Sequence, residues 1–137
     1  MADITPEPLF LSNSIATIGT DNYEAAINSA TFTPSTSTVT FKGLKPGSVF
    51  TRQTAATWVC ELQFVQDWET VGSLSNYLHE HEGESVQFVL VPEADGPTVT
   101  ATIIITPGAI GGAVDTFGVA TVSLGVDGKP VIAPAVP

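Results

Sequence analysis

The sequence of 137 residues has few basic residues. Only four Lys and Arg stand against fourteen Asp and Glu, so the formal net charge is −10. Proteins that hold nucleic acid tightly do so by neutralising phosphates with Lys and Arg, so we expect no tight binding to DNA or RNA. An anionic membrane surface would repel such a chain, so we expect no membrane partner either.

Cysteine and long apolar runs are also scarce. A single cysteine, Cys60, cannot form a disulfide within the chain. It alternates with polar residues on the same side as Trp58 and Leu62, which predicts a buried thiol without the setting of a reactive one. No apolar run approaches the ~18 residues of a membrane span, and the first residues lack the basic segment of a secretory signal. The sequence predicts a soluble protein that is made in the cytoplasm.

Val, Ile, Thr and Phe recur instead in short alternating segments, which are typical of β-strands. One helix is expected at about residues 73–82, where Ser73 can cap its start and Gly83 can end it. We predict one mainly β domain over residues 1–137, a sandwich or barrel of about six to eight strands with this helix at its side. The clearest expected strands are 23–33, 37–41, 57–67, 84–91, 98–106 and 117–126.

Three segments lack this alternation. Residues 1–13 and about 127–137 are interpreted as terminal arms, the second of which begins with a tight turn at Asp127 and Gly128. Residues 42–56 are interpreted as a long loop that is poorly ordered in the isolated subunit and becomes ordered against a neighbouring one, because loops of this length are usually functional or disordered. The loop holds three of the four basic residues: Lys42, Lys45 and Arg52.

No group of side chains has the spacing of a catalytic or metal site. His79 and His81 are two residues apart, so a helix would point them in opposite directions. No serine lies in a nucleophile elbow, and the glycines of residues 107–113 lack the Lys and Ser or Thr of a phosphate-binding loop. We therefore expect no enzymatic activity, no cofactor and no metal.

The alternating strands predict one apolar and one polar face. We expect the apolar face to form the core, with Trp58, Leu62, Phe64, Phe88, Ile103 and Leu124 in it. We expect the polar face to lie on a lumen or another solvated surface, and its candidate residues are Glu61, Gln63, Thr98, Thr100 and Thr102.

Three stretches between Gly72 and Pro130 resemble the major tail proteins, or tail tube proteins, of long-tailed non-contractile phages. They are GSLSNYLHEHEGESVQFVLVP, VTATIIITPGAIGG and GVATVSLGVDGKP. The resemblance implies a subunit made in the host cytoplasm and located in the tail of the virion. Six copies would close a ring, and stacked rings would form a tube through which double-stranded DNA passes without tight binding during ejection. Further implied partners are a tape-measure protein and a tail terminator.

The residues alone leave a second interpretation open. An isolated immunoglobulin-like or adhesin-like β domain that binds a carbohydrate or a protein at a cell surface would explain the strands and turns. It would not explain the three stretches quoted above. The acidic composition favours the tube, since cations lining a conduit would hold the phosphates of DNA.

Overall fold

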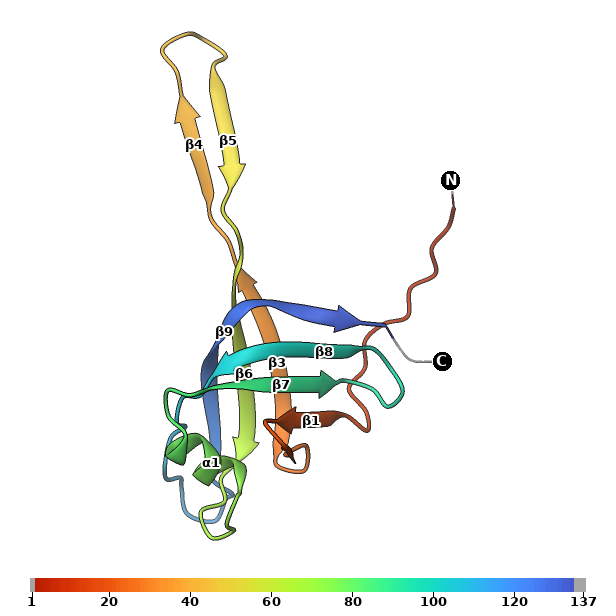
Figure 1. Cartoon of the computed structure of the whole chain (residues 1–137), viewed down its shortest axis with the longest axis vertical. Coiled ribbons are helices and arrows are strands. Elements are labelled where there is room, and N and C mark those ends of the chain that lie inside the picture. The colour runs from red at the N-terminus through yellow and green to blue at the C-terminus, as the bar shows by residue number, and fades with distance from the viewer. Residues whose placement is uncertain (1, 135–137) are drawn as a thin grey trace.

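A computed structural model describes residues 2–134 and confirms a mainly β fold with one short helix (Figure 1). Seven strands form an antiparallel sheet in the order β2-β1-β7-β8-β9-β6-β3, and β4 and β5 form a separate hairpin. In chain order the elements are β1 (Ile15–Ile18), β2 (Asp21–Asn22), β3 (Ile27–Ser35), β4 (Thr38–Lys42), β5 (Val49–Gln53), β6 (Thr57–Val65), α1 (Leu74–Glu80), β7 (Ser85–Val91), β8 (Thr98–Ile104) and β9 (Val119–Ala133).

Strand β9 connects the two layers of the sheet. Its first half pairs with β6, and its second half, from Gly125 onward, pairs with β8. Asp127 lies opposite Thr102 and Val131 opposite Thr100, so extra residues of β9 form a bulge, which bends a strand. In Figure 1, β3 and β6 consequently run across the direction of β7 and β8. The sheet therefore folds over its own core.

The core lies between these crossing layers. Five of the six predicted core residues are buried, each with at most 1% of its surface exposed: Leu62, Phe64, Phe88, Ile103 and Leu124. Trp58, the sixth, is only half-buried at the edge of the core. The two layers meet directly where Phe32 of β3 packs edge-on against Phe88 of β7, with the ring centroids 5.7 Å apart. Helix α1 adds Leu74 and Leu78 to the same core.

We predict very different effects on the free energy of unfolding for a substitution inside the core and one outside it. Leu62→Ala is expected to lower the free energy of unfolding by about 2–5 kcal/mol, because it leaves a cavity in a packed interior. Thr100 lies outside the core, so Thr100→Ala should change the free energy of unfolding by about 0.5 kcal/mol or less. Urea denaturation of both variants measures the difference. Equal or reversed costs would mean that the alternation of buried and exposed residues is assigned wrongly by one position.

The N-terminal strands differ from the prediction. The strand expected at residues 23–33 is β3 (Ile27–Ser35), which continues through Pro34 where the sequence suggested an end. Proline is tolerated there because β3 is an edge strand that pairs only with β6, so the missing N–H removes no second ladder bond. Strands β1 and β2 are not among the predicted strands.

Helix α1 and strands β6, β7 and β8 start within a residue of the prediction and end up to two residues earlier. The start of α1 is fixed by the Ser73 hydroxyl, which accepts a hydrogen bond from the Asn76 N–H. Gly83 follows the helix with a φ of +85°, a backbone conformation that favours glycine.

The prediction of a C-terminal arm at about residues 127–137 is wrong for residues 127–133. These residues continue β9 because β8 offers them a partner, and the expected tight turn at Asp127 and Gly128 is part of the bulge. Gly128 has a φ of +89°, which a glycine adopts without strain. Residues 135–137 lie outside the described part of the chain. At the other end, residues 2–11 form no helix or strand, and the beginning of this arm extends away from the body (Figure 1).

The long loop expected at about residues 42–56 is also wrong, because most of it belongs to a β-hairpin. Strand β4 pairs with β5 from Thr38↔Gln53 to Lys42↔Val49. At the tip, the Ser48 N–H donates to the Lys45 carbonyl over 3.0 Å, and Gly47 has a φ of +84°. Pro46 and Gly47 are thus the central residues of a β-turn that requires a positive φ at its third position.

Candidate functional site: an exposed hairpin and a polar sheet face

The β4–β5 hairpin projects far from the body of the protein (Figure 1). Neither of its strands joins the main sheet. Its base is closed by Ser37 and Thr54: the Thr54 N–H donates to the Ser37 carbonyl over 2.8 Å, and the Ser37 N–H donates to Thr54 Oγ1 over 3.0 Å. Beyond this base, every residue of β4 and β5 is exposed.

One face of the hairpin is largely apolar, although it also carries Arg52, which lies opposite Val39. Phe41 lies opposite Phe50 in the ladder, with the ring centroids 6.4 Å apart, and the two side chains are 66% and 63% exposed. Val39 shares this face, and Leu44 is fully exposed near the tip. A two-stranded hairpin without a covered apolar face is only marginally stable in water. This surface is therefore expected to gain stability by packing on a partner.

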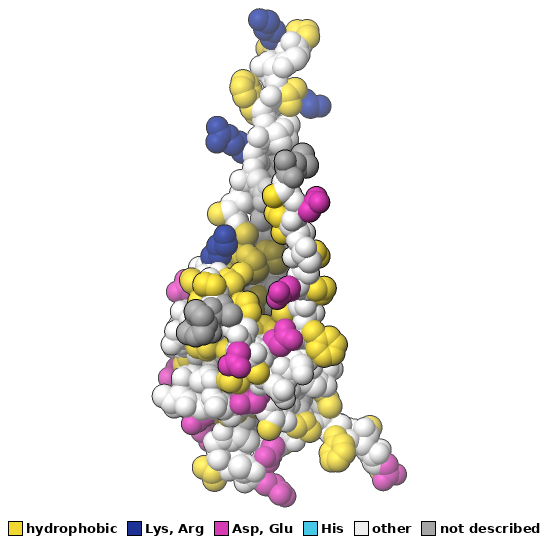
Figure 2. Space-filling model, turned by 90° about the vertical axis from the view of Figure 1, so that its right-hand side faces the viewer, with side chains coloured by type: hydrophobic (Ala, Val, Ile, Leu, Met, Phe, Trp, Pro, Cys, Tyr) yellow, Lys and Arg dark blue, Asp and Glu magenta, His cyan; other side chains and the backbone are white. Residues whose placement is uncertain are grey.

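The hairpin is also the basic part of an acidic protein. Lys42, Lys45 and Arg52 are exposed, and residues 38–53 contain no Asp or Glu. The three cations contribute +3 to a net charge of −10, so the rest of the chain carries −13. The single ion pair among the described residues joins His81 and Glu84, so none of these three cations has a carboxylate partner. Figure 2 shows most of the basic side chains along the hairpin and the acidic ones on the body and the arm.

The outer face of β6 is polar and carries two of the predicted residues. Glu61 is exposed and Gln63 is half-buried. The positions beside them on β3 and β9 all bear hydroxyl groups: Ser29, Thr31, Thr121 and Ser123. This β6 polar face therefore presents a carboxylate among neutral donors and acceptors, and none of these six positions holds a cation.

The other three predicted face residues lie elsewhere. Thr98, Thr100 and Thr102 belong to β8, which is separated from β6 by β9 and runs across it (Figure 1). Thr102 is exposed, whereas Thr98 and Thr100 are half-buried. Because β9 bends between the two layers, the two sets point away from the core in different directions. The five residues do not form one surface.

Sequence reasoning missed an apolar groove near the base of the hairpin. It has a volume of about 380 Å³ and is lined by residues of both layers and of the N-terminal arm, among them Leu11, Phe32 and Trp58. The Trp58 Nε1–H is buried and has no hydrogen-bond partner within the described residues. Figure 2 shows an apolar hollow below the hairpin. Trp58 alternates with core residues in the sequence, so no local signal separates it from them.

Few of the described side chains could react or bind a metal ion. Cys60 is buried as predicted, and burial, together with the nearby charge of Glu61, raises the pKa of its thiol to about 12. Residues 2–134 contain no cluster of three or more His, Cys, Asp or Glu that could hold a metal ion. His81 contacts Glu84 through Nδ1 at 2.6 Å and packs beside the ring of Tyr77. Across the same residues, no helix is long and apolar enough to cross a membrane.

The surfaces of the molecule are therefore the features that indicate its function. The packing of the core does not explain two of these surfaces, the exposed hairpin and the β6 polar face. A comparison with known proteins assigns no family to the chain: no protein-family model matches the sequence, and no curated protein gives a significant match.

Proposed function

We propose that this protein is the structural subunit of a phage tail tube, in which six copies form a ring and stacked rings enclose a channel for double-stranded DNA. The observation that carries the proposal is the hairpin, an exposed, basic and partly apolar arm on an acidic body. The resemblance of residues 72–130 to tail tube proteins supplies the kind of assembly. The subunit would be made in the host cytoplasm and reside in the virion tail.

The placement of the hairpin favours assembly of many copies over pairing of two. The hairpin projects from one end of the body, so its apolar and basic groups can reach another copy and not the body that bears it (Figure 1). A contact between the hairpin of one copy and the body of the next uses two different surfaces. Such heterologous contacts repeat, giving rings where the rotation closes and filaments where it does not.

The sheet edges support the same proposal. Within one chain, β3 has a neighbour on one side only, along nine residues (Ile27–Ser35). An unpaired edge of this length is a template for pairing with another chain. Pairing of edges between neighbouring copies would remove it and would join the sheets of a ring into one continuous wall.

We assign the β6 polar face to the lumen of this tube. Glu61 and its hydroxyl neighbours offer DNA no cation, so phosphates would pass without being held. The tape-measure protein that the resemblance implies would contact this same face before DNA does. Thr98, Thr100 and Thr102 of β8 would then face away from the lumen, and the tail terminator would bind at the end of the tube.

Negative-stain electron microscopy of the purified protein at high concentration tests the proposal. Rings or tubes of uniform width are expected, and added salt should reduce them because it screens the attraction between the basic hairpin and the acidic body. Monodisperse monomers at every concentration would contradict the proposal. That outcome would favour the isolated adhesin-like domain instead.

A further inference from the structure

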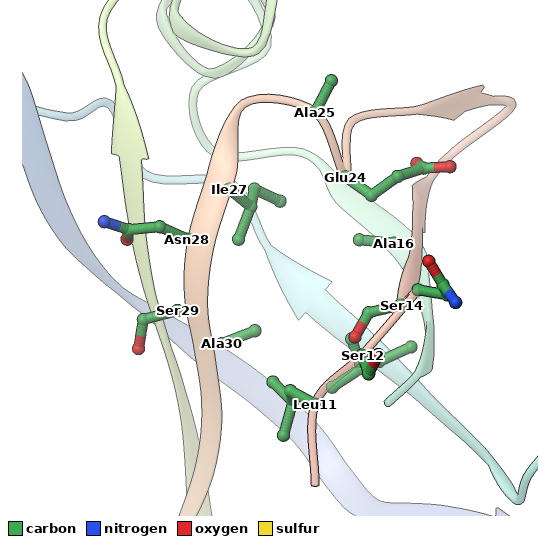
Figure 3. Close-up of a pocket in the computed structure, with 12 residues that line it drawn as sticks. Leu11, Ser12, Ser14, Ala16, Glu24, Ala25, Ile27, Asn28, Ser29 and Ala30 are labelled. Carbon is green, nitrogen blue, oxygen red and sulfur yellow. The ribbon is translucent and has the colours of Figure 1, made fainter. Parts of the chain in front are cut away.

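A second pocket, of about 380 Å³, opens between residues 11–16 and the beginning of β3 (Figure 3). Ala16, Ile27 and Ala30 point into it and give it an apolar floor. Glu24 and Ser14 lie along one rim. The pocket thus combines an apolar floor with a single carboxylate at its mouth.

Glu24 has an unused hydrogen-bonding atom. Its Oε2 is buried, yet it accepts no hydrogen bond from any described residue. A buried carboxylate oxygen without a donor is unfavourable, and a charged donor satisfies it best. Because all the Lys and Arg residues lie outside the pocket lining, a charged donor for this oxygen would come from another molecule.

We propose that this pocket receives the side chain of Lys45 from the hairpin of a second copy, an inference that rests on the self-assembly proposed above. A lysine fits both parts of the pocket: its four-carbon stem packs on the apolar floor while its ammonium group meets Glu24. The ammonium has three N–H donors, and the Ser14 hydroxyl oxygen at the rim offers an additional acceptor. Lys45 is exposed in the turn at the hairpin tip, without a carboxylate partner among the described residues.

The positions of the two surfaces require separate copies. The hairpin follows the last residue of β3, Ser35, whereas the pocket lies beside its first residue, Ile27. Nine residues of strand separate the two ends by roughly 30 Å. A hairpin that projects beyond one end can enter the pocket at the other end only of a neighbouring copy. The contact is therefore head-to-tail, and each copy offers one hairpin and one pocket.

Exchange of the two charges tests this contact. Glu24→Lys and Lys45→Glu should each raise the protein concentration needed for assembly by at least about tenfold, because each brings like charges together at a partly buried site. An equal mixture of the two variants should assemble again. In the mixture, the hairpin of each variant meets an oppositely charged pocket on the other, so the copies alternate. Sedimentation of the single variants and of the mixture at one total concentration measures the effect.

Two controls separate charge pairing from misfolding and from net charge. Glu82→Lys makes the same charge change at an exposed position outside the pocket and should assemble as the unmodified protein does. Glu24→Gln keeps the side-chain shape, so its circular dichroism should be unchanged while its assembly weakens. If the unmodified protein assembles but the mixture does not, the pocket assignment is overturned and the tube proposal stands. If the unmodified protein does not self-associate, both are overturned.

Discussion

Excision of the hairpin is expected to leave a folded monomer that forms neither rings nor tubes. The variant lacks residues 38–53 and joins Ser37 to Thr54 through two glycines, which is feasible because these two residues already hydrogen-bond to each other at the hairpin base. Strands β4 and β5 pair only with each other, so the main sheet loses no ladder partner. Circular dichroism and thermal unfolding should show an intact fold, while electron microscopy at high concentration should show no assemblies.

A second hairpin variant separates its charge from its shape. Replacement of Lys42, Lys45 and Arg52 by Gln keeps the length and the apolar face of the hairpin. Assembly of this variant should be weaker than that of the unmodified protein and less sensitive to salt, because the attraction to the acidic body is removed. For the first variant, which lacks residues 38–53, normal tubes would show that the hairpin is not needed for assembly.

Glu61→Lys is expected to slow the ejection of DNA from particles built with the variant. If the β6 polar face lines a six-fold channel, this change places a ring of about six cations in the path of the DNA, and each cation can hold a phosphate by releasing counterions. Assembly should survive, since an exposed charge on a sheet surface typically changes stability by only about 0.5 kcal/mol. The delay should be greatest at low salt, where screening is weakest. The measurement is the ejection rate as a function of ionic strength.

Thr102→Lys supplies the matched control, because Thr102 is an exposed residue of the other layer. It adds a cation to each subunit on a surface that we place outside the lumen, so ejection should be unaffected at every salt concentration. A delay with Thr102→Lys and none with Glu61→Lys would place β8 in the lumen in place of β6. No delay with either variant, in tubes shown to contain them, would mean that charge on these two faces does not govern passage.

Local patterns predicted the parts of the fold that depend on neighbouring residues. Alternation placed Leu62, Phe64 and Cys60 correctly in the core, because a strand inserted in a two-layer fold buries every second side chain. The helix start at Ser73 was predictable because a cap is a contact between residues three apart.

Alternation predicted the first hairpin strand at residues 37–41, which is β4, but it missed β5, whose two faces are both exposed. Residues 49–53 lack a regular alternation, and the apolar side chains of Phe41 and Phe50 cover no core of their own chain. The length of residues 42–56 therefore favoured a loop. Predicting a strand from its sequence depends on alternation between buried and exposed positions. A strand whose two faces are both exposed in the single chain lacks this contrast.

The amino-acid sequence alone was sufficient to predict a mainly β chain, its acidic charge, the concentration of cations at residues 42–52 and most of the core. Two features become visible only in the folded molecule: β9 bends between two layers, which separates Glu61 from Thr102, and Glu24 borders a pocket with residues 11–16. The two groups of features differ in the sequence distance over which their interactions act. The alternation of side chains along a strand and the capping of a helix depend on residues that are close together along the chain. Sheet order and pockets arise from strands that are distant in sequence and meet only when the sheet folds over.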